Sequence, residues 1–180
     1  MEKRDQCGLT EEEFLSEYKK KNYPRPYLTA DIVVLDKACA LVLLIQRKGH
    51  PFLGQYALPG GFAKPDETIE DTARRELFEE TSVRVSELEP IGLFSKPGRD
   101  PRGWVVSQAF LAVTAASEVR LKSGDDAADA LWFHIAQEDG ALLLRSCSDP
   151  NIVLDATHDL AFDHGEVLLK AFDLFKKKEG

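Results

Sequence analysis

The sequence predicts an α/β fold, in which helices cover a mixed sheet, and three observations lead to this prediction. Short apolar segments bounded by turn residues recur along most of the chain, as strands do. One helical segment, residues 69–81, interrupts them, and an amphipathic segment closes the chain. A length of 180 residues with 43% hydrophobic residues is enough for one core. Strands with an interposed helix and a terminal helix form a sheet between helical layers.

The first 26 residues predict a helix followed by an extended arm. Thr10 and Glu13 have the spacing of a capping box, so we expect a helix from Leu9 to Lys20. The segment 23–26, Tyr-Pro-Arg-Pro, then ends it, because proline forces the residue before it into extended backbone. We therefore predict two parts, an N-terminal helix and arm over residues 1–26 and a main domain over residues 27–180.

The strands of the main domain are predicted from apolar stretches that turn residues separate. A turn at Asp36-Lys37 joins the first two, and Ser148-Asp149-Pro150 supplies the turn of a late hairpin. Residues 96–103 predict a long polar loop, and residues 159–176 predict an amphipathic helix. The expected strands are 28–35, 38–46, 56–58, one within 83–94, 104–113, 130–135 and a hairpin within 141–155.

The helix expected over residues 69–81 carries a concentrated negative charge. Thr68 and Asp71 form a second capping-box pair and place its first turn. Three of its glutamates project within an arc of roughly 100° at 3.6 residues per turn. Such like charges destabilise a bare helix, and a hard divalent cation removes that cost by binding several carboxylate oxygens. The three residues are Glu76, Glu79 and Glu80.

Two further residues support a metal site at this helix. Arg75 lies beside Glu79 on the helical surface and can orient a carboxylate through paired hydrogen bonds. Glu67 precedes the helix, where the Gly60-Gly61 loop can fold it back toward the same metals. The competing interpretation is a solvated acidic face with intrahelical ion pairs, and we assign it to Glu70.

Residues 61–83 read GFAKPDETIEDTARRELFEETSV and resemble the Nudix box, G-x5-E-x7-R-E-U-x-E-E-x-G-U, where U is apolar. Every fixed position is present except the last glycine, which is Ser82 here. A glycine would end the helix in a left-handed conformation that costs a serine more. The resemblance implies a Nudix-type α/β/α sandwich with Mg²⁺ or Mn²⁺ as cofactor. The implied metal ligands are Glu67, Glu76, Glu79 and Glu80.

Segments outside the box resemble the ADP-ribose pyrophosphatase branch of the superfamily, and the resemblance covers about residues 23–172. It implies hydrolysis of a nucleoside diphosphate linked to another moiety, with ADP-ribose cleaved to AMP and ribose 5-phosphate as the expected reaction. Related repressors of the NAD pathway share several of these segments and add a winged helix, for which we expect no room after residue 176. The segments are Arg47 with 51–62, 97–104, 125–127 ahead of 130–133, and 160–164.

Candidate substrate-binding residues follow from the chemistry of a diphosphate. Arg99 and Arg102, on a loop shaped by proline and glycine, can meet phosphate oxygens in bidentate fashion, although pairing with Asp100 is the alternative. Trp104 can stack on adenine, although a tryptophan at a strand start more often belongs to a core or an interface. His164 is expected to cap or bond a neighbouring loop. The remaining candidates are Arg47, Gly60 and Gly61.

The expected chemistry is in-line attack of a metal-activated water on phosphorus. The general base stays open between Glu79, Glu80 and a carboxylate of the loop around Asp126, which would have to swing over the site. Glu76 and Arg75 complete the candidate catalytic set. Two other functions stay open as well. One is hydrolysis of a nucleoside triphosphate such as an oxidised purine, and the other is a catalytically silent ligand sensor.

Charge and composition restrict the partners. A net charge of −8 argues against duplex nucleic acid, but not against a small anion, because bound metals invert the local field. No apolar stretch is long enough to cross a membrane, and three widely spaced cysteines indicate free thiols, so we expect a cytoplasmic protein. Relatives that cleave ADP-ribose are commonly homodimers. The resemblance thus implies a homodimer whose arm, residues 9–26, reaches the partner's site, the alternative being an arm packed on its own subunit or frayed.

Overall fold

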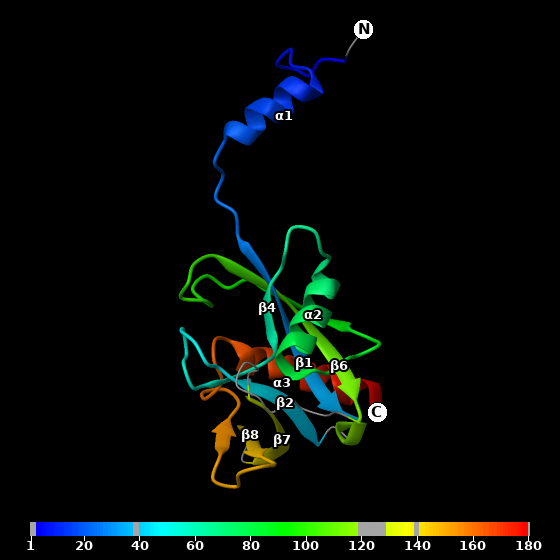
Figure 1. Cartoon of the computed structure of the whole chain (residues 1–180), viewed down its shortest axis with the longest axis vertical. Coiled ribbons are helices and arrows are strands. Elements are labelled where there is room, and N and C mark those ends of the chain that lie inside the picture. The colour runs from blue at the N-terminus through cyan, green and yellow to red at the C-terminus, as the bar shows by residue number, and fades with distance from the viewer. Residues whose placement is uncertain (1–2, 38–39, 119–128, 139–140, 180) are drawn as a thin grey trace.

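A mixed sheet lies between two helices, and a third helix stands away from this body on an extended arm (Figure 1). The computed structural model describes residues 3–37, 40–118, 129–138 and 141–179. Helix α2 (Ile69–Thr81) covers one face of the sheet and α3 (His164–Glu179) covers the other. The α/β/α sandwich predicted from the sequence is confirmed.

The sheet has nine strands within the described ranges, in the order β5-β6-β1-β2-β7-β8-β9, with β3 beside β2 and β4 beside β1. Neighbours are antiparallel except β1 and β6, which run parallel from Tyr27↔Val105 to Asp36↔Thr114. A short 3₁₀ helix, η1 (Ala116–Glu118), follows β6. The strands are β1 (Tyr27–Asp36), β2 (Leu41–Gln46), β3 (Tyr56–Ala57), β4 (Gly60–Phe62), β5 (Glu89–Phe94), β6 (Val105–Thr114), β7 (Asp129–Glu138), β8 (Ala141–Ser146) and β9 (Val153–Asp155).

Two apolar cores, one on each side of the sheet, fix the position of β1. Ile32 and Val34 pack in the core under α2, whereas Val33 and Leu35 pack in the core under α3. All four side chains are fully buried. A strand covered on both faces has no polar side to alternate with, which explains its continuous apolar sequence.

The predicted elements agree with the structure except at two places near the site. Residues 60–62 were expected to be loop, but form β4, which pairs with β1 from Thr29↔Phe62 to Asp31↔Gly60. Helix α3 begins at His164 instead of residue 159. Phe162 has φ of +57°, a conformation that a right-handed helix cannot contain, so the helix starts only after it.

Helix α1 (Glu11–Lys20) forms as predicted, with Thr10 as its N-cap and a complete capping box to Glu13. It buries none of its residues. Phe14, Leu15 and Tyr18 are exposed on it. Within the described residues the Tyr18 ring packs against Phe14 and against Tyr23 of the arm, so the apolar side of α1 is covered only in part. None of the helices in the described ranges is long and apolar enough to span a bilayer.

Ser82 ends α2 in the left-handed conformation that the missing glycine would take. Its φ and ψ are 63° and 11°, and its N–H donates to the carbonyl of Phe78. The Ser82 hydroxyl is buried and has no hydrogen-bond partner among the described residues. Both features are unfavourable, because left-handed backbone costs a residue with a Cβ about 1–2 kcal/mol and a buried unpaired hydroxyl adds to that.

We expect Ser82→Gly to raise the free energy of unfolding by about 0.5–1.5 kcal/mol, after allowing for the greater freedom of glycine in the unfolded chain. At this chain length 1 kcal/mol corresponds to about 2–4 °C in Tm, so we expect a rise of about 1–6 °C, which thermal unfolding measures. Ser82→Ala removes only the unpaired hydroxyl and should lie between the two proteins. A lower Tm for Ser82→Gly would contradict this account of the helix end.

Candidate active site

The turn between β3 and β4 brings backbone against the glutamates of α2. The N–H of Gly60 donates to Oε2 of Glu80 over 2.9 Å. A Cβ on Gly61 would lie 2.5–2.6 Å from the carboxylate atoms of Glu76, and a Cβ on Gly60 would collide with the carbonyl of Ala30. Only glycine therefore allows β4 to approach both β1 and α2 this closely.

Arg75 forms ion pairs with three carboxylates, those of Glu67, Glu76 and Glu79. Its Nε and Nη2 donate to Oε2 and Oε1 of Glu67 over 3.0 and 2.6 Å. Its Nη1 donates to Glu76 over 2.5 Å and to Glu79 over 3.2 Å, and Nη2 also reaches the carbonyl of Phe62. These bonds hold the pKa of Glu67 down at about 2. Glu67 thus folds back against α2 as the sequence predicts.

Glu80 differs from these carboxylates because it points into the protein. Burial raises the pKa of Glu80 to about 8, and the nearby charge of Glu76 acts in the same direction. The hydrogen bond from Gly60 opposes the shift without cancelling it. A carboxyl group whose pKa is raised this far by burial is typical of a functional site.

The donor set fits a hard divalent cation, since it consists of carboxylate oxygens on one loop and one helix face. Among the described residues, no three carboxylates are yet placed close enough together to hold one metal ion. Arg75 instead supplies positive charge among Glu67, Glu76 and Glu79. A hollow beside α2 is lined by Arg47 of the segment after β2 together with Glu76, Glu79 and Glu80.

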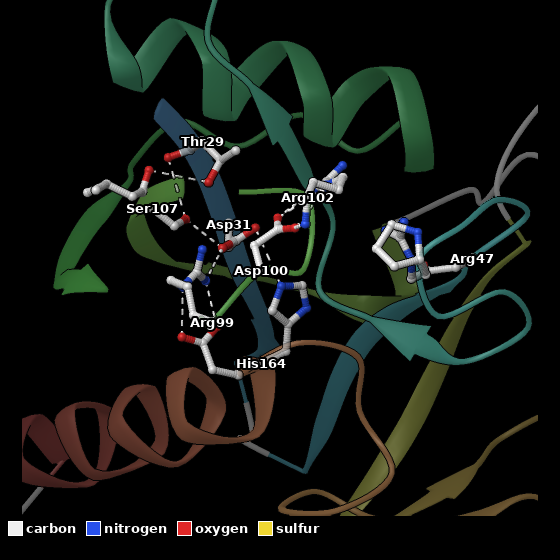
Figure 2. Close-up of polar contacts among 11 residues, drawn as sticks. Thr29, Asp31, Arg47, Arg99, Asp100, Arg102, Ser107 and His164 are labelled. Atoms are coloured by element: carbon white, nitrogen blue, oxygen red, sulfur yellow. Dashed lines mark hydrogen bonds and ion pairs between the residues drawn. The ribbon is translucent and has the colours of Figure 1, made fainter. Parts of the chain in front are cut away.

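A buried polar network surrounds Asp31 of β1 (Figure 2). Asp31 of β1 accepts a hydrogen bond from the hydroxyl of Ser107 on β6 over 2.5 Å. Nη2 of Arg99 lies 3.4 Å from Oδ2 of Asp31, and the same guanidinium donates to both oxygens of Asp163. The network ties β1, β6, the loop before β6 and the start of α3 to one another.

His164 links this network to the glycine turn. Its Nδ1 accepts the N–H of Leu58 over 2.9 Å, which confirms that it bonds a neighbouring loop. Its Nε2 faces Oδ1 of Asp31 at 3.6 Å. Because Nδ1 accepts this hydrogen bond, the proton of the imidazole is assigned to Nε2, and burial lowers the pKa of His164 in the same sense.

The two arginines proposed for the diphosphate differ in their surroundings. The Arg99 side chain is 4% exposed and bonds Asp163 and Asp31, two partners that no sequence pattern indicated. Arg102 pairs with Asp100 through Nε and Nη2, which is the alternative raised by their spacing. The Arg102 side chain nonetheless remains 39% exposed.

The other candidates take three different positions. Arg47 donates through Nε to the carbonyl of Pro51 and lines a second pocket, which it shares with Arg102, Gly60 and Gly61. Trp104 is 56% exposed at the start of β6, away from this pocket. Asp126 lies outside the described residues.

Asp31 and Phe162 also line this second pocket, and the sequence analysis assigned neither of them a role. Asp31 carried a signal, because a charged residue stands inside an otherwise apolar strand. Phe162 lies in the segment 160–164, but its place in the pocket depends on its backbone conformation. The two hollows meet at Arg47, which lines both of them.

Comparison with known proteins gives matches over most of the chain. The model of the NUDIX domain family matches residues 25–150. The chain is 45% identical over 94 residues to an "ADP-ribose pyrophosphatase" of Methanocaldococcus jannaschii, covering 52% of this chain and 54% of that protein. It is 31% identical over 175 residues to the "ADPR responsive transcriptional repressor NtrR" of Acinetobacter baylyi, covering 94% and 62%. It thus spans between half and two thirds of the length of these relatives.

Solved structures share the fold. A MutT/nudix family protein from Enterococcus faecalis matches with a TM-score of 0.77 and 40% identity, over 94% of this chain and 70% of that one. The NUDIX domain of Shewanella oneidensis NrtR, solved in complex with ADP ribose, matches with a TM-score of 0.71 and 30% identity, over 93% and 99%.

Proposed function

Since the chain belongs to the NUDIX domain family, we propose that it is a divalent-metal-dependent pyrophosphohydrolase that cleaves ADP-ribose to AMP and ribose 5-phosphate. The observation that carries the proposal is the position of Arg47, which lines both the glutamate hollow beside α2 and the pocket that contains Arg102. Cation-binding carboxylates and phosphate-binding guanidinium groups thus adjoin, which is what a metal-bound diphosphate requires. The similarity to an ADP-ribose pyrophosphatase supports the substrate.

The roles of individual residues follow from this arrangement. Glu67, Glu76, Glu79 and Glu80 would hold Mg²⁺ or Mn²⁺, which polarises a diphosphate and lowers the pKa of a bound water. Arg47 and Arg102 would face the phosphate oxygens. Gly60 fixes Glu80 through its N–H, and Arg75 fixes Glu67 and Glu76. The general base remains one of Glu79, Glu80 and Asp126.

Steady-state assays with purified protein, ADP-ribose and Mg²⁺ test the proposal. We expect AMP and ribose 5-phosphate as products and no turnover once EDTA removes the metal. A panel of nucleoside triphosphates, oxidised purines included, belongs in the same experiment, because release of pyrophosphate would identify the alternative enzyme. Turnover of such a compound without turnover of ADP-ribose would refute the substrate.

A ligand sensor is the second candidate, and the match along 94% of this chain to an ADPR-responsive repressor favours it. The complete set of box carboxylates favours an enzyme instead. Calorimetry separates the two functions. Tight binding of ADP-ribose, with no hydrolysis under Mg²⁺, Mn²⁺ or any other divalent cation, would identify a sensor.

We also propose a homodimer in which the arm of one subunit covers the other. Phe14, Leu15 and Tyr18 of α1 are exposed, and so are Tyr27 and Trp104, which are joined by a backbone hydrogen bond at the base of the arm. Apolar groups on both parts are suited to bury one another between two copies, since aromatic side chains are favoured at interfaces. The dimer would place α1, which contacts little of its own subunit, against a partner.

Deleting residues 1–22 should therefore weaken dimerisation and raise the KM for ADP-ribose. Analytical ultracentrifugation at micromolar concentration measures the first effect and steady-state kinetics the second. Leu15→Glu and Tyr18→Glu, each made singly, should act like the deletion. Ser16→Glu adds the same single charge away from the apolar side of α1 and should not. A fully active monomer would contradict the dimer.

A further inference from the structure

Phe162 occupies a backbone conformation that aromatic residues rarely adopt. Its φ is +57°, and Phe52, whose ring packs edge-on against it at 4.7 Å, has φ of +62°. Positive φ at a bulky side chain is a genuine outlier and persists only where the surrounding structure enforces it. Such strain concentrates at functional sites, so two strained aromatic residues in contact call for a function.

This backbone conformation places the Phe162 ring against two guanidinium groups, those of Arg47 and Arg102. Cζ of Arg47 lies 4.9 Å from the ring centroid and Cζ of Arg102 lies 5.3 Å from it. Both distances are within the range of a cation–π interaction. The Phe62 ring supports Arg102 as well, at 4.7 Å. One aromatic ring therefore holds two guanidinium groups from distant parts of the chain at the same pocket.

Two cations this close repel one another unless an anion joins them. The positive charge of Arg102 lowers the pKa of Arg47, in addition to the larger effect of burial. Asp100 offsets the charge of Arg102 by accepting hydrogen bonds from its Nε and Nη2. Among the described residues, Nε of Arg47 donates to an uncharged carbonyl, that of Pro51. A ligand with anionic oxygens on two linked phosphorus atoms would bridge the pair.

We propose that Phe162 is a positioning residue that holds Arg47 and Arg102 at the spacing of a diphosphate, and so selects diphosphates over uncharged nucleosides. The proposal rests on the proposed function for its substrate class, but its test does not need hydrolysis. The ring contacts the arginines and not the reacting atoms, so its removal affects binding of the anion more than the chemical step.

The experiment measures metal-free binding of ADP and of adenosine by calorimetry in four proteins. Phe162→Leu keeps an apolar side chain and loses the aromatic face, and we expect its affinity for ADP to fall on the order of ten-fold. Phe162→Tyr keeps the face and should bind ADP as the unaltered protein does. Phe52→Leu, which removes the packing partner without touching either guanidinium, should lose stability but keep more of its ADP affinity than Phe162→Leu.

Kinetics on the same proteins add a second measurement. With ADP-ribose, Phe162→Leu should raise KM on the order of ten-fold and change kcat by less than about three-fold. Unchanged ADP binding in folded Phe162→Leu would overturn the proposal, as would an equal loss of ADP and adenosine affinity or failure of the unaltered protein to bind ADP. Absence of ADP-ribose turnover alongside the expected ADP binding would refute only the proposed function.

Discussion

Glu80→Gln should lower kcat for ADP-ribose by a factor on the order of 10³ or more, since loss of one electrostatic contact of this kind costs roughly 10²–10³ and metal occupancy falls as well. The amide keeps the size of the side chain, and its oxygen can still accept the N–H of Gly60, so the fold should survive. Glu76→Gln should reduce kcat to a similar degree. Initial rates over a range of Mg²⁺ concentrations measure both effects.

Glu70→Gln is the matched control, because Glu70 lies in the exposed first turn of the same helix and should be nearly neutral. Equal losses in all three variants would show that the metal face of α2 is misplaced. The two active-site variants should differ in stability. Without metal, Glu76→Gln loses an ion pair to Arg75, whereas Glu80→Gln removes a carboxyl group whose ionisation is unfavourable in its buried position.

The pH dependence follows from the raised pKa of Glu80. A carboxyl whose pKa is about 8 when folded, against an ordinary value near 4.5, stabilises the fold fully below pH 4.5. That contribution disappears as the pH rises to 8 and above. The gain in Tm from Glu80→Gln in EDTA should therefore be larger at pH 9 than at pH 6.

Arg75→Gln should have the second largest effect, on stability and activity together. The Arg75 side chain is 20% exposed and holds Glu67 and Glu76, whose side chains are 13% and 16% exposed. Replacing Arg75 leaves two carboxylates without their countercharge, so the free energy of unfolding should fall, and solvent screening at this partly exposed site moderates the loss. With Glu67 and Glu76 no longer oriented, kcat should fall on the order of 10².

Arg74→Gln is the control for the neighbouring position. Arg74 donates to the carbonyls of Val85 and Ser86 and touches none of the box carboxylates through a hydrogen bond. Its replacement should cost some stability and leave kcat within about three-fold. Added Mg²⁺ should raise the Tm of Arg75→Gln more than that of the unaltered protein, because the metal replaces the missing positive charge. Indistinguishable behaviour of the two variants in thermal unfolding and kinetics would contradict the role of Arg75.

The arrangement of the glutamates around Arg75 was predictable because it is local in sequence. Residues 60–81 contain the glycine turn and α2, and the boundaries of α2 follow from the capping box at Thr68 and the left-handed Ser82. Glu67 needs only a short loop to reach Arg75. Arg102 and Asp100 are two residues apart, so their pairing was visible as an alternative.

The surroundings of Arg99 and Phe162 depend on contacts between distant segments, which no local sequence pattern encodes. Arg99 meets Asp31 and Asp163 only because β1 and β6 are parallel neighbours and α3 starts beside them. Strand β4 escaped prediction because glycines have low strand propensity, and its pairing with β1 is a tertiary effect. The positive φ of Phe162 is likewise imposed by packing, and it moved the start of α3 with it.

The close contact between Gly61 and Glu76 bears on how members of such a family diverge. An alanine at residue 61 would set a methyl group about 2.6 Å from that carboxylate. Because the carboxylate ends a flexible side chain, it can swing aside and let the protein fold, but it then leaves its place beside β4. A single methyl group would thus abolish the proposed hydrolysis, although every charged residue of the Nudix box and the pocket lined by Arg47 and Arg102 would remain. Ligand recognition can outlive catalysis in such a lineage, and an intact set of carboxylates is no proof that a descendant is still an enzyme.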